Sequence, residues 1–417
     1  MRRLAVLSMH TSPLAQPGTG DGGGMNVYVR ELSSALARAG VACDVFTRAS
    51  SSSLPATVEV EPGLVVHHIS AGPPTDVPKN ELYSYTGAFA DGVEQRLEVL
   101  SAAGFPTDAI HANYWLSGIA GHSLKHRLDL PLVSTFHTLD RVKAEASPDE
   151  IDPLDPDRRA RSEAEIIGCS DAVLASCSTE VDQLVDLYGA VRDRVEIIAP
   201  GVDHAFFSPG DKAQARRALQ LEFDVPLLLF VGRIQPLKGA DVAIRTLHAL
   251  ARFNLDASRL LIVGGPSGPS GGTELDALRR LTVELALSDR VQFVPPQPHE
   301  LLSTFYRAAD CCIVPSRAES FGLVALEAGA CGTPVVASAV GGLSSLIESG
   351  RTGYLIESRD PMAFARHVAR VISEPRLARE LGANAAERAR SYTWSIAAAR
   401  LRRLYFELTA RSLVECR

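Results

Sequence analysis

Apolar and polar residues follow two periods along the first half of the chain, one typical of strands and one typical of helices. Short apolar runs that suit buried strands lie at 3–9, 41–47, 64–70, 109–113, 131–137, 172–178 and 195–200. Between the first two runs, the segment from Met25 places Val29, Leu32 and Leu36 on one helical face and ends at Gly40. Strands that alternate with helices of this length predict a parallel sheet with right-handed crossovers.

The alternation starts again after a break at 202–212, where Pro, Gly, Asp and aromatic residues interrupt the apolar pattern. Strands are expected at 226–234, 259–265, 290–296, 311–315, 334–338 and 353–358, and helices at 240–253, 273–287, 299–310 and 323–330. Three helical stretches follow, and the last begins near Trp394 and holds Leu401, Leu404 and Leu408 on one stripe. The second half therefore predicts another doubly wound sheet.

The length of 417 residues exceeds what one ordinary hydrophobic core accommodates. We predict an α/β protein with two Rossmann-like domains, at 1–205 and 206–390. The residues 391–417 should form a C-terminal helix that returns to the first domain.

Two glutamates mark the passage from a predicted strand to a predicted helix. Glu319 and Glu327 stand eight residues apart, after the apolar run at 311–315 and around the start of the helix at 323–330. Unpaired N–H groups and the positive end of the helix dipole make such a start suitable for a diphosphate. A carboxylate on each side of that diphosphate can accept hydrogen bonds from sugar hydroxyls. The spacing indicates a nucleotide-sugar site.

Two cations occupy the equivalent place after the first strand of the second half. Arg233 and Lys238 lie in VGRIQPLKG, between a very apolar strand and a helix that opens at Gly239. Ligands bind at the carboxyl ends of strands in open α/β sheets, so these cations can neutralise a diphosphate as it leaves. A solvated pair of loop cations is the alternative.

The loop HTSPLAQPGTGDGGGMN contains five glycines between the first strand and the first helix. Gly18, Gly20 and Gly23 satisfy GxGxxG, but they come too late after the strand for a dinucleotide fingerprint. The end of the second strand, VFTR, also lacks the acidic residue that would bind an adenine ribose. The loop can instead hold a phosphate or approach a sugar closely, unless it is a flexible surface loop.

Aromatic and imidazole side chains end several strands of the first half. His10 and His137 each close an apolar run, and Tyr114 and Trp115 follow another. Since the carboxyl ends of parallel strands share one sheet edge, these residues are candidates for ligand contact. A structural role for each histidine and core packing for the two aromatic residues remain the alternatives.

Composition narrows the function classes. A net charge of −7 and a pI near 5.9 give no global attraction to nucleic acid or anionic lipid. No apolar run suits a membrane span or a signal peptide, so we expect a cytoplasmic protein. The seven cysteines form no CxxC or metal-ligand spacing, and we expect buried reduced thiols.

The segments ESFGLVALE, GRIQPLKG, TGDGGGMNVYV, HANYWLSG and STFHTL together resemble the retaining GT-B glycosyltransferases of family 4. Within that family the chain is similar to the members that glycosylate inositol 3-phosphate in mycothiol biosynthesis. The resemblance covers nearly the whole chain and implies two Rossmann-like domains that face each other across a cleft. It also implies transfer of N-acetylglucosamine from UDP-N-acetylglucosamine to 1D-myo-inositol 3-phosphate, with retention of the α configuration.

The resemblance assigns the donor mainly to the second domain. Arg233 and Lys238 would bind the UDP diphosphate, Glu319 the sugar hydroxyls and Glu327 the uridine ribose. With His137, the first three are our candidate catalytic residues. The other donor contacts implied are Gln16, Pro17, Gly24, Gln297, Phe321, Gly322 and Leu323. Gln297 departs from the arginine usual in the family.

The resemblance assigns the inositol phosphate to the first domain. Lys79, Tyr114, Thr138 and Arg161 would surround its phosphate, and Arg158 and Arg159 lie beside Arg161 in the sequence. The ring would contact His10, Asp21, Gly22, Gly23, Gly24, Met25 and Asn26. The family also implies a homodimer and a peripheral Mg²⁺ held by Tyr306, Arg307, Ala309 and Thr333, largely through backbone carbonyls.

Two rival functions stay open from the sequence. Another family 4 transferase could use a different nucleotide sugar, or a sugar phosphate or lipid acceptor, as sucrose-phosphate synthase-like relatives would. A two-domain ligand-binding protein would share the paired α/β lobes but has no need of the Glu319/Glu327 pair. For the transferase, the sequence supplies no obvious carboxylate nucleophile beside the anomeric carbon, because Glu319 and Glu327 are both assigned to hydroxyls. We therefore expect same-face attack, with the departing phosphate taking the acceptor's proton.

Overall fold

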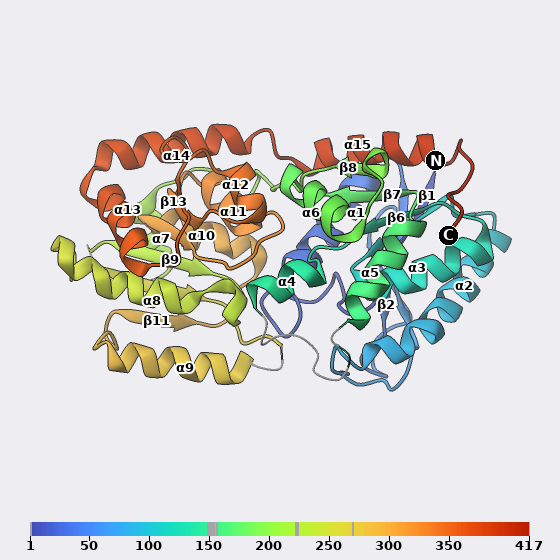
Figure 1. The fold of residues 1–417 in the computed structure, drawn as a ribbon, viewed down its shortest axis with the longest axis horizontal. Coiled ribbons are helices and arrows are strands. Elements are labelled where there is room, and N and C mark those ends of the chain that lie inside the picture. The colour runs from blue at the N-terminus through green and yellow to red at the C-terminus, as the bar shows by residue number, and fades with distance from the viewer. Residues whose placement is uncertain (1, 148–154, 156, 222–224, 269–270, 417) are drawn as a thin grey trace. The chain divides into compact units, whose positions relative to one another are not determined.

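The computed structural model describes residues 2–147, 155, 157–221, 225–268 and 271–416. These residues form two compact units. The first unit combines 1–15, 25–200 and 394–417, and the second combines 16–24 with 201–393. Figure 1 shows a sheet covered by helices in each unit.

The first unit contains an eight-stranded sheet in the order β3-β4-β2-β1-β5-β6-β7-β8. Its strands are β1 (Arg3–Leu7), β2 (Ala42–Arg48), β3 (Thr57–Glu61), β4 (Leu64–Ile69), β5 (Ala109–Asn113), β6 (Leu132–Thr135), β7 (Ala172–Ala175) and β8 (Val195–Ile197). All neighbours are parallel except β3 and β4. The antiparallel β3 differs from the predicted parallel sheet because the tight turn at 62–63 folds the chain back at the sheet edge.

Helices cover both faces of this sheet. The helices α2 (Thr86–Ala102), α3 (Trp115–Leu128), α5 (Arg158–Cys169) and α6 (Ser178–Tyr188) share one hydrophobic core. The short α4 (Asp140–Ala146) contacts α5, and the 3₁₀ turns lie at Leu82–Tyr85 and Arg192–Arg194. On β5, Ile110 and Ala112 enter this core, so His111 points to the opposite face, which α1 (Gly24–Arg38) covers.

The C-terminal helix α15 (Trp394–Leu408) belongs to the first unit, on the same face as α1. The Tyr405 hydroxyl lies 2.7 Å from His111 Nδ1, and the Trp394 and Tyr28 rings meet edge to face at 5.8 Å. His111 Nε2 also lies 2.8 Å from Thr135 Oγ1, so both ring nitrogens of a buried imidazole have partners. This contact fixes the last long helix to the central strands.

Burial of His111 predicts acid-sensitive stability. Burial lowers its pKa from 6.5 to about 3, so between these values only the unfolded chain binds the proton. The resulting stabilisation is complete above 6.5 and is lost as the pH falls towards 3, by about 1.4 kcal/mol per pH unit for this proton. Urea denaturation over a pH series should therefore show a steeper loss in the wild type than in His111→Gln. Identical slopes in the wild type and in His111→Gln would contradict the assignment.

The second unit contains a six-stranded, wholly parallel sheet in the order β11-β10-β9-β12-β13-β14. Its strands are β9 (Leu227–Val231), β10 (Arg259–Val263), β11 (Val291–Val294), β12 (Cys311–Val314), β13 (Val335–Ser338) and β14 (Tyr354–Ile356). Each lies within a segment where the apolar pattern predicts a strand.

The helices of the second unit form two layers, one on each face of the sheet. One layer holds α8 (Ala240–Ala249), α9 (Gly271–Glu284) and α13 (Pro361–Ser373), and the other holds α7 (Lys212–Ala218), α10 (Leu302–Ala308) and α11 (Leu323–Ala330). The short α12 (Gly341–Leu346) and the long α14 (Pro375–Ala389) both contact α11. The 3₁₀ turns lie at Pro236–Lys238, Leu250–Phe253 and His299–Leu301.

The fold corrects one expectation about the cysteines. Cys43, Cys177, Cys311, Cys312 and Cys331 are buried and not disulfide-bonded, as predicted. Cys169 and Cys416, however, form a disulfide across a sequence separation of 247 residues. The prediction of reduced thiols is wrong for this pair because the C-terminal tail returns to the end of α5. Among the described helices, none combines the length and apolar character that a membrane span requires.

Candidate active site

In the second unit, the loops after β9 and β12 bring Lys238 and Glu319 together. These two strands are neighbours at the point where the strand order changes direction. Lys238 Nζ donates a hydrogen bond to Glu319 Oε2 at 2.6 Å, and Ser316 Oγ donates to the same oxygen at 3.2 Å. The two charged side chains are 22% and 18% exposed. A solvent-accessible ion pair therefore lies at the sheet edge where doubly wound folds bind ligands.

Close backbone approaches at two glycines hold these loops in place. Gly239, which follows Lys238, has a φ of 72°, and a Cβ there would lie 2.3 Å from the Pro315 carbonyl oxygen. The Gly342 N–H donates to the Glu319 carbonyl at 2.9 Å. A side chain at Gly239 would push apart the loops that carry the lysine and the glutamate.

Arg233, the second predicted cation, lies beside the glycine-rich loop. Its Nη1 donates to Ser267 Oγ at 3.3 Å. A Cβ added to Gly23 would lie 3.0 Å from Arg233 Nε, so the loop backbone approaches the guanidinium closely. The loop segment 16–24 is part of the second unit, and absence of a side chain permits this approach.

Two glutamines contact the turn that follows β11. Gln16 Nε2 donates to the Pro296 carbonyl at 3.1 Å, and Gln297 Nε2 donates to the Pro295 carbonyl at 2.8 Å. The Gln297 side chain is thus directed back onto its own turn. Pro17 follows Gln16 in the same loop segment.

At the start of α11, the groups that a ligand could contact are backbone N–H groups rather than polar side chains. Phe321 is buried and packs on Tyr392, with ring centroids 5.8 Å apart. Gly322 precedes the helix with a φ of 102°, and Leu323 is its first residue. The first N–H groups of a helix lack partners within it, so this end can donate hydrogen bonds to an anion.

Glu327 is more deeply buried than the sequence suggested, at 4% exposure. Its Oε1 lies 2.7 Å from His299 Nε2, and its Oε2 accepts a hydrogen bond from the Tyr306 hydroxyl at 2.8 Å. Burial raises the pKa of Tyr306 well above its ordinary value, and the nearby Glu327 charge raises it further. The phenol therefore stays protonated and donates this hydrogen bond. Neither residue was expected to contact Glu327: the family resemblance implied Tyr306 only as a magnesium ligand, and the sequence did not single out His299. Their only signal was a histidine and a tyrosine on the segment expected to form the preceding helix.

In the first unit, cations gather around Tyr114 at the end of β5. Lys79 Nζ lies 5.3 Å and Arg159 Cζ 4.8 Å from the ring centroid, and Arg159 Nη1 donates to the Tyr114 hydroxyl at 3.1 Å. The His10 ring stacks at 4.4 Å in a tilted arrangement. Burial acts to raise the pKa of Tyr114, but the nearby charges, Arg159 and Lys79 foremost, outweigh it and lower that pKa. The positive potential here suits a phosphate dianion.

Arg159 links this group to the loop after β6. Its Nη2 donates to the Thr138 carbonyl at 2.6 Å and to Thr138 Oγ1 at 3.0 Å, while Nε donates to the buried Glu163 at 2.8 Å. Arg161, the predicted phosphate ligand, is 61% exposed and pairs with Asp155 at 3.0 Å. Residues two apart on a helix point in nearly opposite directions, so the predicted group gathers around Arg159 instead. The sequence signal for Arg159 was Glu163, because an acidic residue four positions later on a helix can pair with the arginine.

His137 adopts a left-handed backbone conformation, with a φ of 62°, directly after β6. Its Nε2 lies 2.9 Å from Asn113 Oδ1, and its ring meets Tyr28 edge to face at 4.8 Å. Burial lowers the pKa of His137 to about 3, with a smaller contribution from the nearby His111. The imidazole is therefore neutral at ordinary pH. Strained residues that the surrounding structure holds in place are concentrated at functional sites. Trp115, by contrast, is buried in the core.

The remaining predicted acceptor residues are divided between the units. Asn26, beside Met25 in the first turn of α1, donates to Thr11 Oγ1 and to the Ser12 carbonyl, both at 2.6 Å. Residues 21–24 belong to the loop segment of the second unit, where a Cβ on Gly24 would lie 3.4 Å from Leu323 Cδ1.

Three of the four predicted magnesium ligands lie at the end of α10, and Thr333 follows α11. The Tyr306 carbonyl already accepts hydrogen bonds from Thr333 Oγ1 at 2.6 Å and from the Ala309 N–H at 3.2 Å. The Arg307 guanidinium donates to the Ser208 carbonyl at 2.8 Å, and no carboxylate belongs to the predicted set. Because Mg²⁺ sites usually include carboxylates, these residues fit the ion poorly, and we assign it no step.

Two doubly wound units, each with candidate ligand-binding residues at the carboxyl ends of its strands, have the architecture of the GT-B glycosyltransferases, and the likeness to solved structures selects that class. Among solved structures, sucrose-phosphate synthase from Thermosynechococcus elongatus superposes with a TM-score of 0.88 at 35% identity, covering 98% of this chain and 100% of that one. A complex of Anabaena Alr3699/HepE with UDP and glucose shares the fold, with a TM-score of 0.75 at 18% identity over 98% of this chain and 100% of that one.

Sequence comparisons are more specific. Residues 23–201 match the glycosyl transferase 4-like domain, and residues 211–388 match the glycosyl transferases group 1. D-inositol 3-phosphate glycosyltransferase from Acidothermus cellulolyticus is 46% identical over 94% of this chain and 87% of its own length. The enzyme of that name from Actinosynnema mirum is 47% identical over 94% of each chain. The chain belongs to the family 4 glycosyltransferases.

Proposed function

We propose that this glycosyltransferase transfers N-acetylglucosamine from UDP-N-acetylglucosamine to 1D-myo-inositol 3-phosphate, with retention of the α configuration and release of UDP. The observation that carries the proposal is the cation group around Tyr114. Arg159 and Lys79 face one buried phenol, and Thr138 adds a hydroxyl. The curated relatives named above support inositol 3-phosphate as the phosphorylated acceptor.

The donor side of the proposal rests on the second unit. Lys238 and Arg233 would bind the diphosphate with the N–H groups at the start of α11, and Glu319 would bind hydroxyls of the transferred sugar. Glu327 would bind the uridine ribose; its two oxygens each accept one hydrogen bond, and each carboxylate oxygen has a second lone pair. The UDP and glucose held by the structurally similar Alr3699/HepE support a nucleotide-sugar donor.

The proposed chemistry exchanges one bond of the anomeric carbon for another and transfers one proton. An inositol hydroxyl attacks the anomeric carbon while the bond from that carbon to the β-phosphate oxygen breaks, through an oxocarbenium-like state. The departing phosphate takes the hydroxyl proton on the same face, which accounts for retention. Glu319 is held by Lys238 in the described structure and would be engaged by sugar hydroxyls, so neither glutamate is assigned as nucleophile. Catalysis is then mostly positioning and stabilisation of the leaving group.

A second candidate function has one observation in its favour. The likeness to sucrose-phosphate synthase covers 98% of this chain at 35% identity. The cation group around Tyr114 would bind the phosphate of a sugar phosphate equally well. A lipid acceptor has less support, because the net charge of −7 disfavours an anionic membrane surface. The homodimer stays a prediction of the family resemblance.

An acceptor screen tests the proposal. UDP release from UDP-N-acetylglucosamine should require 1D-myo-inositol 3-phosphate and should not occur with unphosphorylated inositol. Sugar phosphates such as fructose 6-phosphate are the matched controls, and UDP-glucose is the donor control. Product NMR should show an α linkage. UDP release only with a sugar phosphate would favour the second candidate, and a β linkage would contradict retention.

A further inference from the structure

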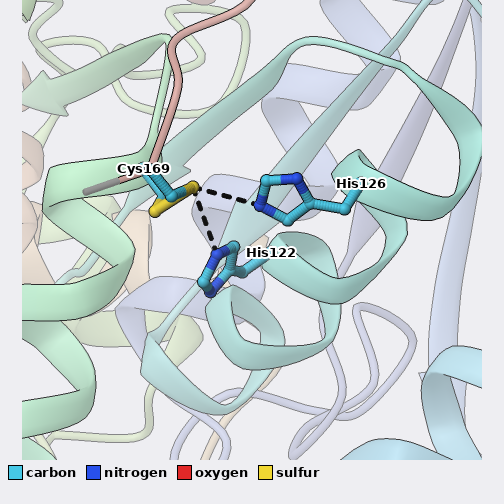
Figure 2. A group of neighbouring side chains, drawn as sticks. His122, His126 and Cys169 are labelled. Carbon is cyan, nitrogen blue, oxygen red and sulfur yellow. Dashed lines mark hydrogen bonds between the residues drawn. A yellow bond between two sulfur atoms is a disulfide. The ribbon is translucent and has the colours of Figure 1, made fainter.

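Four potential metal ligands gather in the first unit, on the elements α3, α5 and the C-terminal tail. His122 and His126 lie four residues apart on one face of α3, Cys169 ends α5, and Cys416 lies in the tail. One ligand atom from each residue lies within 4.8 Å of all the others. Figure 2 shows both imidazoles directed at one sulfur atom of the disulfide. We call these four residues the His₂Cys₂ cluster.

Both imidazole nitrogens lie close to one sulfur of the Cys169–Cys416 disulfide. Cys416 Sγ lies 3.0 Å from His126 Nε2 and 3.4 Å from His122 Nε2. The two imidazole rings are tilted by 62° with centroids 5.0 Å apart, so both nitrogens can face one point. Metal–nitrogen and metal–sulfur bonds of ~2.0 to ~2.3 Å in a tetrahedron place ligand atoms roughly 3.3–3.8 Å apart.

A separate buried network holds the tail beside α3 and α5. The Asp171 carboxylate accepts a hydrogen bond from the Val414 N–H at 2.7 Å and pairs with Lys125 at 2.9 Å. Lys125 lies on α3 between the two histidines in sequence and donates to the Cys169 carbonyl at 2.7 Å. The polar contacts thus connect α3, the end of α5 and the tail, which together carry the cluster. The position of Cys416 is defined by its neighbours and not by the sulfur–sulfur bond alone.

We propose that the reduced His₂Cys₂ cluster binds one Zn²⁺ ion in a tetrahedral structural site that fastens the C-terminal tail to α3 and α5. Two imidazoles and two thiolates are the ligands of structural zinc, and a softer set of this kind disfavours Mg²⁺ and Ca²⁺. The disulfide between Cys169 and Cys416 is the oxidised alternative for the same two sulfurs.

Conversion of the disulfide into the zinc site requires an external reductant, a thiol or a phosphine. Reduction adds two electrons and two protons to the disulfide and gives two thiols. Zn²⁺ then displaces both thiol protons as it binds the two thiolates, while the histidines bind as neutral imidazoles. The two sulfur atoms separate to the distance that a tetrahedron requires. The last residues of the tail move in this step, because Cys169 is fixed at the end of α5.

The test uses the full chain, stripped of metal with a chelator and reduced with a phosphine. After addition of Zn²⁺ and desalting, elemental analysis should find one zinc per chain. Co²⁺ as a probe should give the visible bands of a tetrahedral site with thiolate charge transfer. His126→Gln and Cys416→Ser should weaken zinc binding by at least ~100-fold, since loss of an outer-shell partner alone can cost that much. Both positions are at least partly exposed, so these variants should fold.

Two variants serve as controls. His248→Gln removes an exposed histidine of α8, and Cys331→Ser removes a buried free thiol; both should keep the zinc. The oxidised wild type should bind none. A folded, reduced wild type that retains no zinc would overturn the proposal and leave the disulfide as the only role of the pair. Zinc retained equally by His126→Gln and Cys416→Ser would also overturn it.

Discussion

Replacing Lys238 by alanine is expected to lower turnover by at least ~100-fold, the largest effect on catalysis that we predict for a single side chain. The lysine lies at the switch point of the second sheet, 2.6 Å from Glu319, where we propose that the diphosphate of the donor binds. If its charge stabilises the leaving group, the loss appears in kcat, because negative charge on the departing phosphate develops in the transition state. Steady-state kinetics with UDP-N-acetylglucosamine as the varied substrate measure this.

Lys212 provides the matched control for that experiment. It also forms an ion pair at 2.6 Å, with Asp310, and is 50% exposed on α7. Lys212→Ala should change kcat by less than ~2-fold, as surface ion pairs contribute little. If Lys238→Ala raised only the KM for the donor and left kcat intact, the lysine would bind substrate and transition state equally. The assignment to the leaving group would then fail.

Replacing Arg159 by methionine is expected to raise the KM for 1D-myo-inositol 3-phosphate by at least ~30-fold. Loss of one partner from a buried, charged hydrogen bond costs about 2–5 kcal/mol, and about 1.4 kcal/mol corresponds to each tenfold change in affinity. The KM for the donor should stay unchanged, because the donor contacts are assigned to other residues. Initial rates with each substrate varied in turn separate the two values.

Arg161 and Glu163 supply the controls for this experiment. Arg161→Met should have little effect, since that guanidinium is exposed and pairs with Asp155. Glu163→Gln removes the carboxylate charge that pairs with Arg159. It should have a smaller effect on the acceptor KM than Arg159→Met. If Arg161→Met raised the acceptor KM and Arg159→Met did not, Arg161 would be the phosphate ligand, as expected from the sequence.

Apolar periodicity was sufficient for most of the fold. It predicted β12 and α11 nearly to their ends, as well as the last helix from Trp394, because buried parallel strands and amphipathic helices have distinct periods. It did not predict the antiparallel β3. Whether an edge segment turns back or crosses over depends on a short turn rather than on the period of apolar residues.

The candidate site was predictable in its residue types and only partly in its pairings. Lys238 and Glu319 were both expected near a diphosphate, but their direct contact depends on the adjacency of β9 and β12, which are separated by two other strands in sequence. The partners of Glu327 depend on how α10 packs against α11. On α5, helical phase alone could not decide which of three neighbouring arginines turns inward.

The sequence by itself determined the two α/β sheets, the cations and carboxylates at the strand ends, and membership of a glycosyltransferase family, because these depend on local periods and short motifs. Only the tertiary structure decided that Arg159 faces Tyr114, that His299 and Tyr306 hold Glu327, and that Cys416 meets Cys169, His122 and His126. These contacts join residues that lie from 21 to 294 positions apart, so no local spacing reveals them. They follow from chain topology and from the buried network around Asp171, which brings the tail to α3.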